Sequence, residues 1–167
     1  MIRILPFAPA HAAGVVSVIV PIQQAEFGIP ITLEAQPDLQ DIPGFYQRGH
    51  GNFWVAETEG GEIVGTVALL DIGQQQGALR KMFVAASHRG KAHGVAQALL
   101  GTLLAWGRER DIREVFLGTT DKFLAAHRFY EKQGFTRVEP GRLPLGFPVM
   151  SVDTRFYALA LQAPAGA

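Results

Sequence analysis

The segment 63–72 constrains the fold most, because apolar residues occupy both of its alternating faces. A strand at the surface alternates apolar and polar side chains, whereas a central strand covered on two sides is apolar throughout. Polar turns bound the segment at 59–62 and 73–77, and strands are predicted beyond them at 52–57 and 78–84. The sequence therefore predicts an antiparallel meander whose middle strand is buried on both faces.

A different pattern follows the meander. Ala96, Leu99, Leu100 and Leu103 recur at helical spacing and predict a helix over 94–107. Before the meander, the sequence predicts a strand at 2–5, a helix at 10–27 and a short helix within 29–48. After the helix at 94–107 it predicts a strand at 114–118 and a helix at 122–133, whose N-cap lies among Thr119, Thr120 and Asp121. Two strands at 135–138 and 152–161 follow, separated by a Pro/Gly-rich loop at 140–148. This order predicts an α/β (α+β-like) fold, with a mixed central sheet of about six to seven strands and helices on both faces.

Length and composition limit what the chain can do. The 167 residues fit one domain, predicted at 1–162, with a frayed tail at 163–167. Lys and Arg number 15, as do Asp and Glu, so the chain lacks the basic surplus typical of nucleic-acid binders. The absence of cysteine excludes disulfides, thiolate zinc sites and an acyl-cysteine intermediate, and suits the cytoplasm. The histidine spacings match no metal-binding set, and the apolar run at 12–20 is too short to cross a membrane. No metal, nucleic-acid or membrane partner is therefore predicted.

The segment 81–96 joins a predicted strand to a predicted helix through a basic loop that contains glycine. The first amides of a helix lack partners within the helix, and the helix dipole places partial positive charge there, so such a junction can bind a phosphate. Glycine allows a close approach to the backbone, while Arg89 and Lys91 add positive charge. The segment is compatible with a phosphate or pyrophosphate site and equally with an ordinary turn whose basic residues are solvated. It fits neither the P-loop nor the dinucleotide-binding pattern.

Two segments carry a resemblance to a known family. The loop is similar to the acetyl-coenzyme A loop of the GNAT family of N-acetyltransferases, whose pattern is Gln/Arg-x-x-Gly-x-Gly/Ala. Arg89 and Gly94 match its first and last positions, while Ala92 replaces its middle glycine. The segment 126–135 resembles the family's Ala-x-x-x-Tyr-x-x-x-Gly-Phe motif, although Phe123 stands where an Asn is common. With the strands around them, the two motifs cover 78–138.

The resemblance implies a binding site for acetyl-CoA. In the family, coenzyme A enters a cleft between two parallel strands that splay apart, here 78–84 and 114–118. The main chain of Met82, Phe83 and Val84 would pair with the pantetheine arm. The residues implied in the remaining coenzyme contacts are Arg89, Gly90, Lys91, Ala92, His93, Gly94 and Val95 around the pyrophosphate, and Ala126 and Tyr130 in the second motif.

The same resemblance implies a reaction. It is the transfer of an acetyl group to a primary amine by direct attack in a ternary complex, catalysed by a cytoplasmic N-acetyltransferase. The Val84 amide would stabilise the oxyanion, and Tyr130 would protonate the leaving thiolate. A role as a core aromatic residue is the alternative for Tyr130, because Phe123 and Ala126 share its predicted helical face. The acceptor would be a small-molecule or peptide amine bound by 24–48 and 140–148, and the family also allows a homodimer through the C-terminal strand.

Several alternatives stay open at this point. Glu26, Glu57 and Asp71 are candidates for the base that takes the proton of the amine. Arg80 or Lys81 could attract a carboxylate on the acceptor, or both could belong to a solvated strand face. A non-catalytic acyl-CoA-binding sensor is the main alternative function, and a binder of another phosphorylated ligand is the third.

Overall fold

The computed structural model describes residues 1–90 and 92–161, so Lys91 and the predicted tail at 163–167 lie outside the described residues. Seven strands form one sheet in the order β1-β2-β3-β4-β5-β7-β6. They are β1 (Ile2–Pro6), β2 (Asn52–Thr58), β3 (Ile63–Asp71), β4 (Gln76–Val84), β5 (Glu114–Thr119), β6 (Thr136–Val138) and β7 (Arg155–Ala160). The first four are antiparallel neighbours, and β4 and β5 are parallel, which confirms the predicted meander and the mixed sheet.

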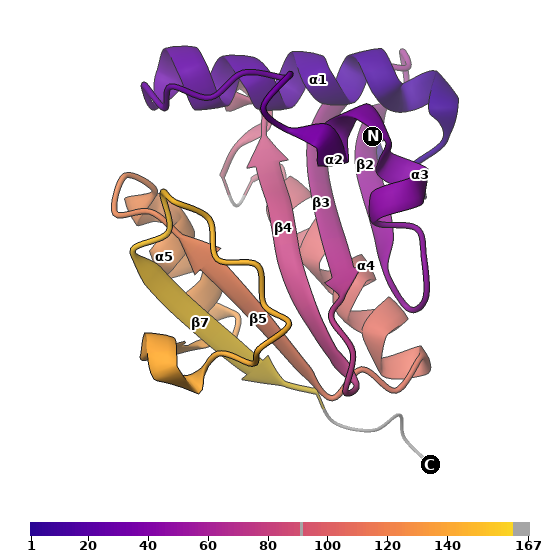
Figure 1. Cartoon of the computed structure of the whole chain (residues 1–167). Coiled ribbons are helices and arrows are strands. Elements are labelled where there is room, and N and C mark those ends of the chain that lie inside the picture. The colour runs from indigo at the N-terminus through magenta and orange to yellow at the C-terminus, as the bar shows by residue number, and fades with distance from the viewer. Residues whose placement is uncertain (91, 162–167) are drawn as a thin grey trace.

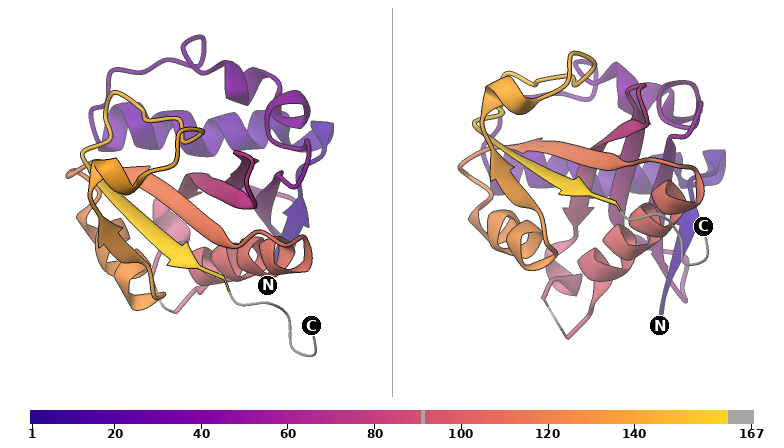
Figure 2. Two further views of the ribbon diagram at one scale, coloured as in Figure 1. Left: turned by 60° about the horizontal axis from the view of Figure 1, so that its bottom comes forward. Right: turned by 90° about the horizontal axis from the view of Figure 1, so that it is seen from below.

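Helices cover both faces of the sheet, as predicted. They are α1 (Ala12–Pro21), which continues into the π-helix η2 (Ile22–Glu26), then α2 (Pro37–Gln40), α3 (Ile42–Phe45), α4 (Val95–Glu109) and α5 (Leu124–Lys132). In Figure 2 (right), α4 and α5 lie below the sheet, and α2 and α3 lie above it. The side chains of β2 divide accordingly, because Trp54 packs in the core under α4 whereas Phe53 and Val55 pack in the core under α1. β3 is buried on both alternations from Ile63 to Leu69, which explains its continuous apolar sequence.

The sheet opens between β4 and β5 (Figure 1). Their parallel pairing is confined to Gln76–Ala78 against 114–116, although both strands continue well beyond it. A register shift in the β3–β4 ladder accompanies the divergence, and Lys81 has a φ of 56°, in the left-handed region. A β-bulge of this kind bends the strand and increases its twist, so it turns β4 away from β5. The splayed strands that the family resemblance implied are therefore present.

The predicted helix at 10–27 is present as α1 and η2, and it changes type after Pro21, where the amide of Phe27 donates to the Ile22 carbonyl in a π-type bond. Three other local predictions were wrong. In place of one helix within 29–48 there are two single turns, α2 and α3. The N-cap predicted among 119–121 is absent, because Thr120 closes a separate turn and α5 begins only at Leu124. β7 begins at Arg155 instead of 152, because a turn between Met150 and Asp153 precedes it.

β7 also differs from expectation in its surroundings. It pairs with β5 on one side and with β6 on the other, both antiparallel. The edge strands of the sheet are β1 and β6. β6 therefore covers Phe156–Ala158, the middle of β7, on the edge where the family resemblance suggested strand pairing across a dimer.

Candidate active site

The edge of β4 that faces β5 supplies main-chain groups to the gap. Phe83 pairs with Thr66 of β3, and the Ala85 amide donates to the Val64 carbonyl. Because successive residues of a strand point their amides to opposite edges, the amide of Val84 faces the gap. The Val84 carbonyl, on the same edge, accepts a hydrogen bond from Nε of Arg89 at 2.8 Å. The side chains of Met82 and Val84 pack on the α4 side of the sheet, and that of Phe83 packs on the α1 side.

The loop at the wide end of the gap has the features of an anion site. Gly90 (φ 96°) and Gly94 (φ 64°) lie in the left-handed region, and a Cβ on either would meet no atom within 4 Å. Gly94 is the N-cap of α4, no side chain of the described residues caps the helix, and its first turn holds no acidic residue. Its first amides are therefore free to bind a ligand. Ala92 and His93 are exposed in the loop, and Val95 is buried as the first residue of α4.

Arg89 ties this loop to η2. Its guanidinium donates to both carboxylate oxygens of Glu26, with Nη2 to Oε2 at 2.7 Å. The hydrogen bond from Arg89, aided by its charge, holds the pKa of Glu26 below the ordinary value in spite of partial burial. Glu26 is therefore ionised and engaged, which makes it a weak proton acceptor.

The other two candidate bases lie away from the gap. Glu57, on β2, pairs with Arg3 at 2.7 Å and lies 3.6 Å from His11. Asp71, at the end of β3, accepts the amides of His50 and Gly73. Both carboxylates hold local structure together, and neither lines the pocket beside the gap.

Tyr130, on α5, is 5% exposed and packs edge-on against Phe135 with ring centroids 5.6 Å apart. Its hydroxyl has no hydrogen-bond partner among the described residues. Burial raises the pKa of the Tyr130 phenol well above its ordinary value, so the hydroxyl keeps its proton at neutral pH. Tyr130 and Val95 belong to one core cluster, against which Met82 and Ala126 also pack, so the fold brings the two sequence motifs together.

A pocket lies beside the narrow part of the gap. β4 contributes Arg80, Lys81 and Phe83, the end of β5 contributes Gly118, and the loop before β7 contributes residues that include Asp153. The predicted acceptor walls contribute too, with Ile29, Ile31, Phe147 and Pro148 among the lining residues. Sequence reasoning missed Asp153 because it fell within the strand predicted at 152–161.

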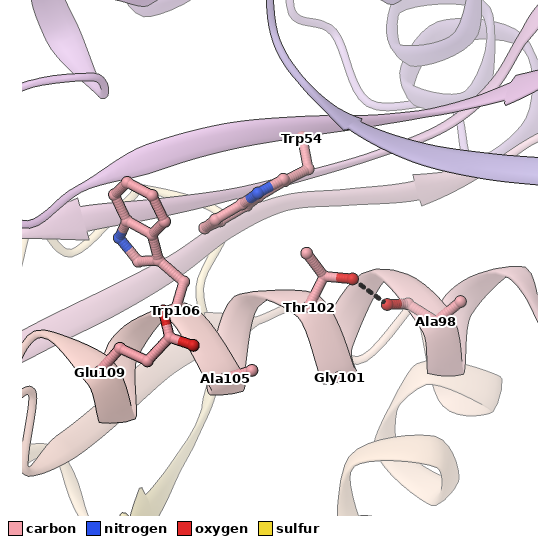
Figure 3. A pocket seen from close by; sticks show the side chains of 7 residues that line it. All are labelled: Trp54, Ala98, Gly101, Thr102, Ala105, Trp106 and Glu109. Carbon is pink, nitrogen blue, oxygen red and sulfur yellow. Dashed lines mark hydrogen bonds between the residues drawn. The ribbon is translucent and has the colours of Figure 1, made fainter.

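A second hollow lies along α4, on the side where Trp54 of β2 reaches the helix (Figure 3). Trp54 and Trp106 meet there edge-on, beside a stripe of small residues that includes Gly101. The Thr102 hydroxyl is satisfied within the helix by the Ala98 carbonyl at 2.9 Å. The hollow carries a carboxylate, Glu109, and no cationic side chain, so it does not match an anion site.

The described residues hold no group of three or more His, Cys, Asp or Glu side chains that could bind a metal ion. Within the same residues, no helix combines the length and the apolar character that crossing a membrane requires.

Comparison with known proteins agrees with the geometry. Residues 18–135 match the model of the acetyltransferase (GNAT) family. The chain is 37% identical over 107 residues to N-acetyltransferase family 8 member 2 of Rattus norvegicus (61% of this chain, 46% of that protein). It is 38% identical over 103 residues to N-acetylaspartate synthetase of Xenopus tropicalis (60% of this chain, 37% of that protein). It thus spans less than half of the length of these two relatives.

Solved structures extend the likeness to almost the whole chain. An acetyltransferase of the GNAT family from Staphylococcus aureus Mu50 superposes with a TM-score of 0.92 and 35% sequence identity. That comparison covers 97% of this chain and 100% of the other. The chain belongs to the acetyltransferase (GNAT) family, as its loop motif and its α5 motif together predicted.

Proposed function

We propose that this chain is an acyl-CoA-dependent N-acyltransferase, which transfers an acetyl group from acetyl-CoA to a primary amine by direct attack in a ternary complex. The observation that carries the proposal is the gap between β4 and β5, with the uncapped N-terminus of α4 at its wide end. Family membership supports it, as do the names of relatives that include N-acetylaspartate synthetase.

The residues around the gap fit the coenzyme. In the segment of β4 at Met82, Phe83 and Val84, the edge that faces the gap offers main-chain groups to the pantetheine arm, the Val84 amide among them, whereas Phe83 faces β3. The open space over Gly90 and Gly94 and the free amides of α4 suit the pyrophosphate. When bound, acetyl-CoA supplies the thioester carbonyl that the amine attacks. Arg89 can hold the loop in place through Val84 and Glu26 while the phosphates bind.

Two groups of this chain then assist the transfer. The Val84 amide, which points into the gap, can donate to the carbonyl oxygen as negative charge develops on it. The Tyr130 hydroxyl is protonated and has no partner among the described residues, so it can donate its proton to the departing sulfur. The sheet fixes the first of these groups and core packing fixes the second, so neither needs to reorganise during the reaction.

The proposal is tested by ligand-induced thermal stabilisation with acetyl-CoA, CoA, ATP and NADH. A ligand at one hundred times its Kd stabilises the folded state by about 2.7 kcal/mol. For a chain of this size that corresponds to a rise in Tm of about 5–10 °C. We expect this rise with acetyl-CoA and CoA, and none with ATP or NADH.

Gly94→Glu places a carboxylate where a phosphate would lie, so we expect it to abolish the rise. Gly101→Glu is the matched control, because Gly101 is an exposed glycine of the same helix with open space around it. No rise in Tm with acetyl-CoA, even at millimolar concentration, would remove the basis of the proposal. Coenzyme binding without CoA release across a broad amine panel would instead favour a non-catalytic sensor.

The cellular setting belongs to the same proposal. We place the enzyme in the cytoplasm, because proteins there are rarely stabilised by disulfides and this chain contains no cysteine. A homodimer is part of the proposal, and within it β6 covers the middle of β7 against strand pairing. Fractionation of the native host and sedimentation of the purified chain test these two points.

A further inference from the structure

The bulge in β4 separates two adjacent cations. Lys81 turns inward, where its side chain is 7% exposed and its Nζ lies 3.5 Å from Oδ2 of Asp38 and 2.5 Å from Oε1 of Gln36. The same carboxylate of Asp38 accepts the Tyr46 hydroxyl at 2.6 Å. Lys81 is therefore committed to a buried internal network and is not available to a ligand.

Arg80 turns toward the pocket beside the gap. Its guanidinium lies over the rings of Phe45 and Tyr46, with its Cζ 5.7 Å and 5.9 Å from their centroids. Its hydrogen bond goes to the sulfur of Met150 at 3.3 Å, a weak acceptor, and no carboxylate of the described residues pairs with it. A half-buried guanidinium that lies against aromatic rings and has no ion-pair partner among the described residues favours binding of a planar anion such as a carboxylate.

Asp153 lies across the same pocket. Its Oδ2 accepts the amide of Met150 at 2.9 Å, and the carboxylate sits against Gly118 so closely that a Cβ there would be 2.5 Å from Oδ2. Gly118 belongs to the part of β5 that has already parted from β4. Burial raises the pKa of Asp153 above its ordinary value, although the Met150 amide and the charge of Arg80 oppose the rise. The gap thus has a carboxylate next to it whose proton affinity exceeds that of a solvated aspartate.

We propose that Arg80 and Asp153 are the two poles of an acceptor site for amino acids, in which Arg80 binds the carboxylate of the acceptor and Asp153 takes the proton from its amine. Met150 links the poles, because its sulfur contacts Arg80 and its amide holds Asp153. No ion pair joins the two poles, so both stay open to a zwitterion. This inference rests on the proposed acyltransferase function and names its substrate class.

The chemistry balances with these groups. The acceptor first loses its ammonium proton to solvent. The lone pair of the neutral amine then forms the new C–N bond as the C–S bond of the thioester breaks. The remaining excess proton on nitrogen goes to the Asp153 carboxylate, and the sulfur receives a proton from Tyr130. Exchange with water restores both side chains, and the net products are an N-acetyl amino acid, CoA and one proton.

The test compares free L-amino acids with the corresponding L-amino acid amides, followed by release of the CoA thiol. The two panels have nearly the same shape and differ in the negative charge. We expect the acids to be the better acceptors. We expect Arg80→Met to raise KM for the acids about 10- to 100-fold, with little effect on the amides or on KM for acetyl-CoA. Arg110→Met is the matched control, because Arg110 also lies over an aromatic ring, that of Trp106, but away from the pocket.

Asp153→Asn tests the second pole, since the amide still accepts the Met150 amide but cannot take a proton. We expect kcat to fall by about 100-fold or more, with the acidic limb of the kcat profile, which reports groups of the bound complex, lost and the Tm rise with acetyl-CoA retained. Equal use of acids and amides, or an unchanged pH profile in Asp153→Asn, overturns the proposal while leaving the acyltransferase function intact. No thiol release from either panel overturns the amino-acid acceptor site, and the acyltransferase function is then decided separately by thiol release across the broad amine panel.

Discussion

The buried pair of Lys81 and Asp38 offers a sharp test of how the bulge in β4 is held. Both side chains are 7% exposed, and their charges are 3.5 Å apart. At an effective dielectric constant near 20, that separation corresponds to an attraction of about 5 kcal/mol before the penalty of desolvation. Burial lowers the pKa of Lys81, and the charge and hydrogen bond of Asp38 act against that shift. Asp38 is therefore what allows Lys81 to stay protonated in the folded chain.

Asp38→Asn removes the negative charge and leaves the ammonium buried. Breaking one side of a buried ion pair costs about 3–5 kcal/mol, and we expect the free energy of unfolding at pH 7 to fall by that amount. The loss should shrink as the pH rises. The folded-state pKa of Lys81 lies below that of the unfolded chain, so between the two values the unfolded chain binds more protons and stability increases with pH.

Urea unfolding at several values between pH 7 and pH 10 measures both effects. Lys81→Met and the double variant complete a thermodynamic cycle, in which the double variant should lose less stability than the sum of the single variants. A loss below about 0.5 kcal/mol in Asp38→Asn, typical of neutral surface changes, or a loss independent of pH, would refute the reasoning.

Two further predictions concern the gap. Tyr130→Phe removes a hydroxyl that has no hydrogen-bond partner among the described residues, so Tm should stay nearly constant. The kcat should fall by about 100-fold or more, because the departing sulfur loses its proton donor. A fall in Tm with unchanged kcat would instead make Tyr130 purely structural. Glu26→Gln weakens a half-exposed ion pair with Arg89 and should change stability by less than about 1 kcal/mol. KM for acetyl-CoA should fall in this variant, because Arg89 becomes free to approach the phosphates, and a rise in KM would show that Glu26 is needed to position Arg89.

The coarse fold followed from sequence because its signals are local. Alternation identified β3 as doubly covered, and apolar spacing located α4 to within a few residues. The cap of α5 was mispredicted for a physical reason. Thr120 can form either an N-cap or a separate turn, and its hydroxyl accepts the Lys122 amide ahead of the helix. Short polar residues compete for local backbone groups in this way, so residue type alone did not locate the helix start.

The site was less accessible to sequence reasoning, because it depends on direction and distance. Arg80 and Lys81 are neighbours with the same charge, and both line the pocket. The bulge separates their charged ends, because the Lys81 ammonium is held by Asp38 in a buried network while the Arg80 guanidinium pairs with no carboxylate of the described residues. Asp153 resembled part of a strand until the turn from Met150 placed its carboxylate against Gly118. The three carboxylates suggested as bases were chosen by residue type, and the fold engages each in other contacts.

The divergence of β4 and β5 also bears on how the chain avoids unwanted association. The two outer edges of the sheet are short, five residues in β1 and three in β6, and short edges are poor templates for other chains. Beyond Ala78, the edge of β4 that faces β5 has no strand partner, and it lies inside the molecule between two helical layers. A neighbouring polypeptide would have to part those layers to reach it, whereas a slender flexible ligand can slide in from the end. The same opening thus admits a narrow ligand and keeps this unpaired strand edge away from other chains.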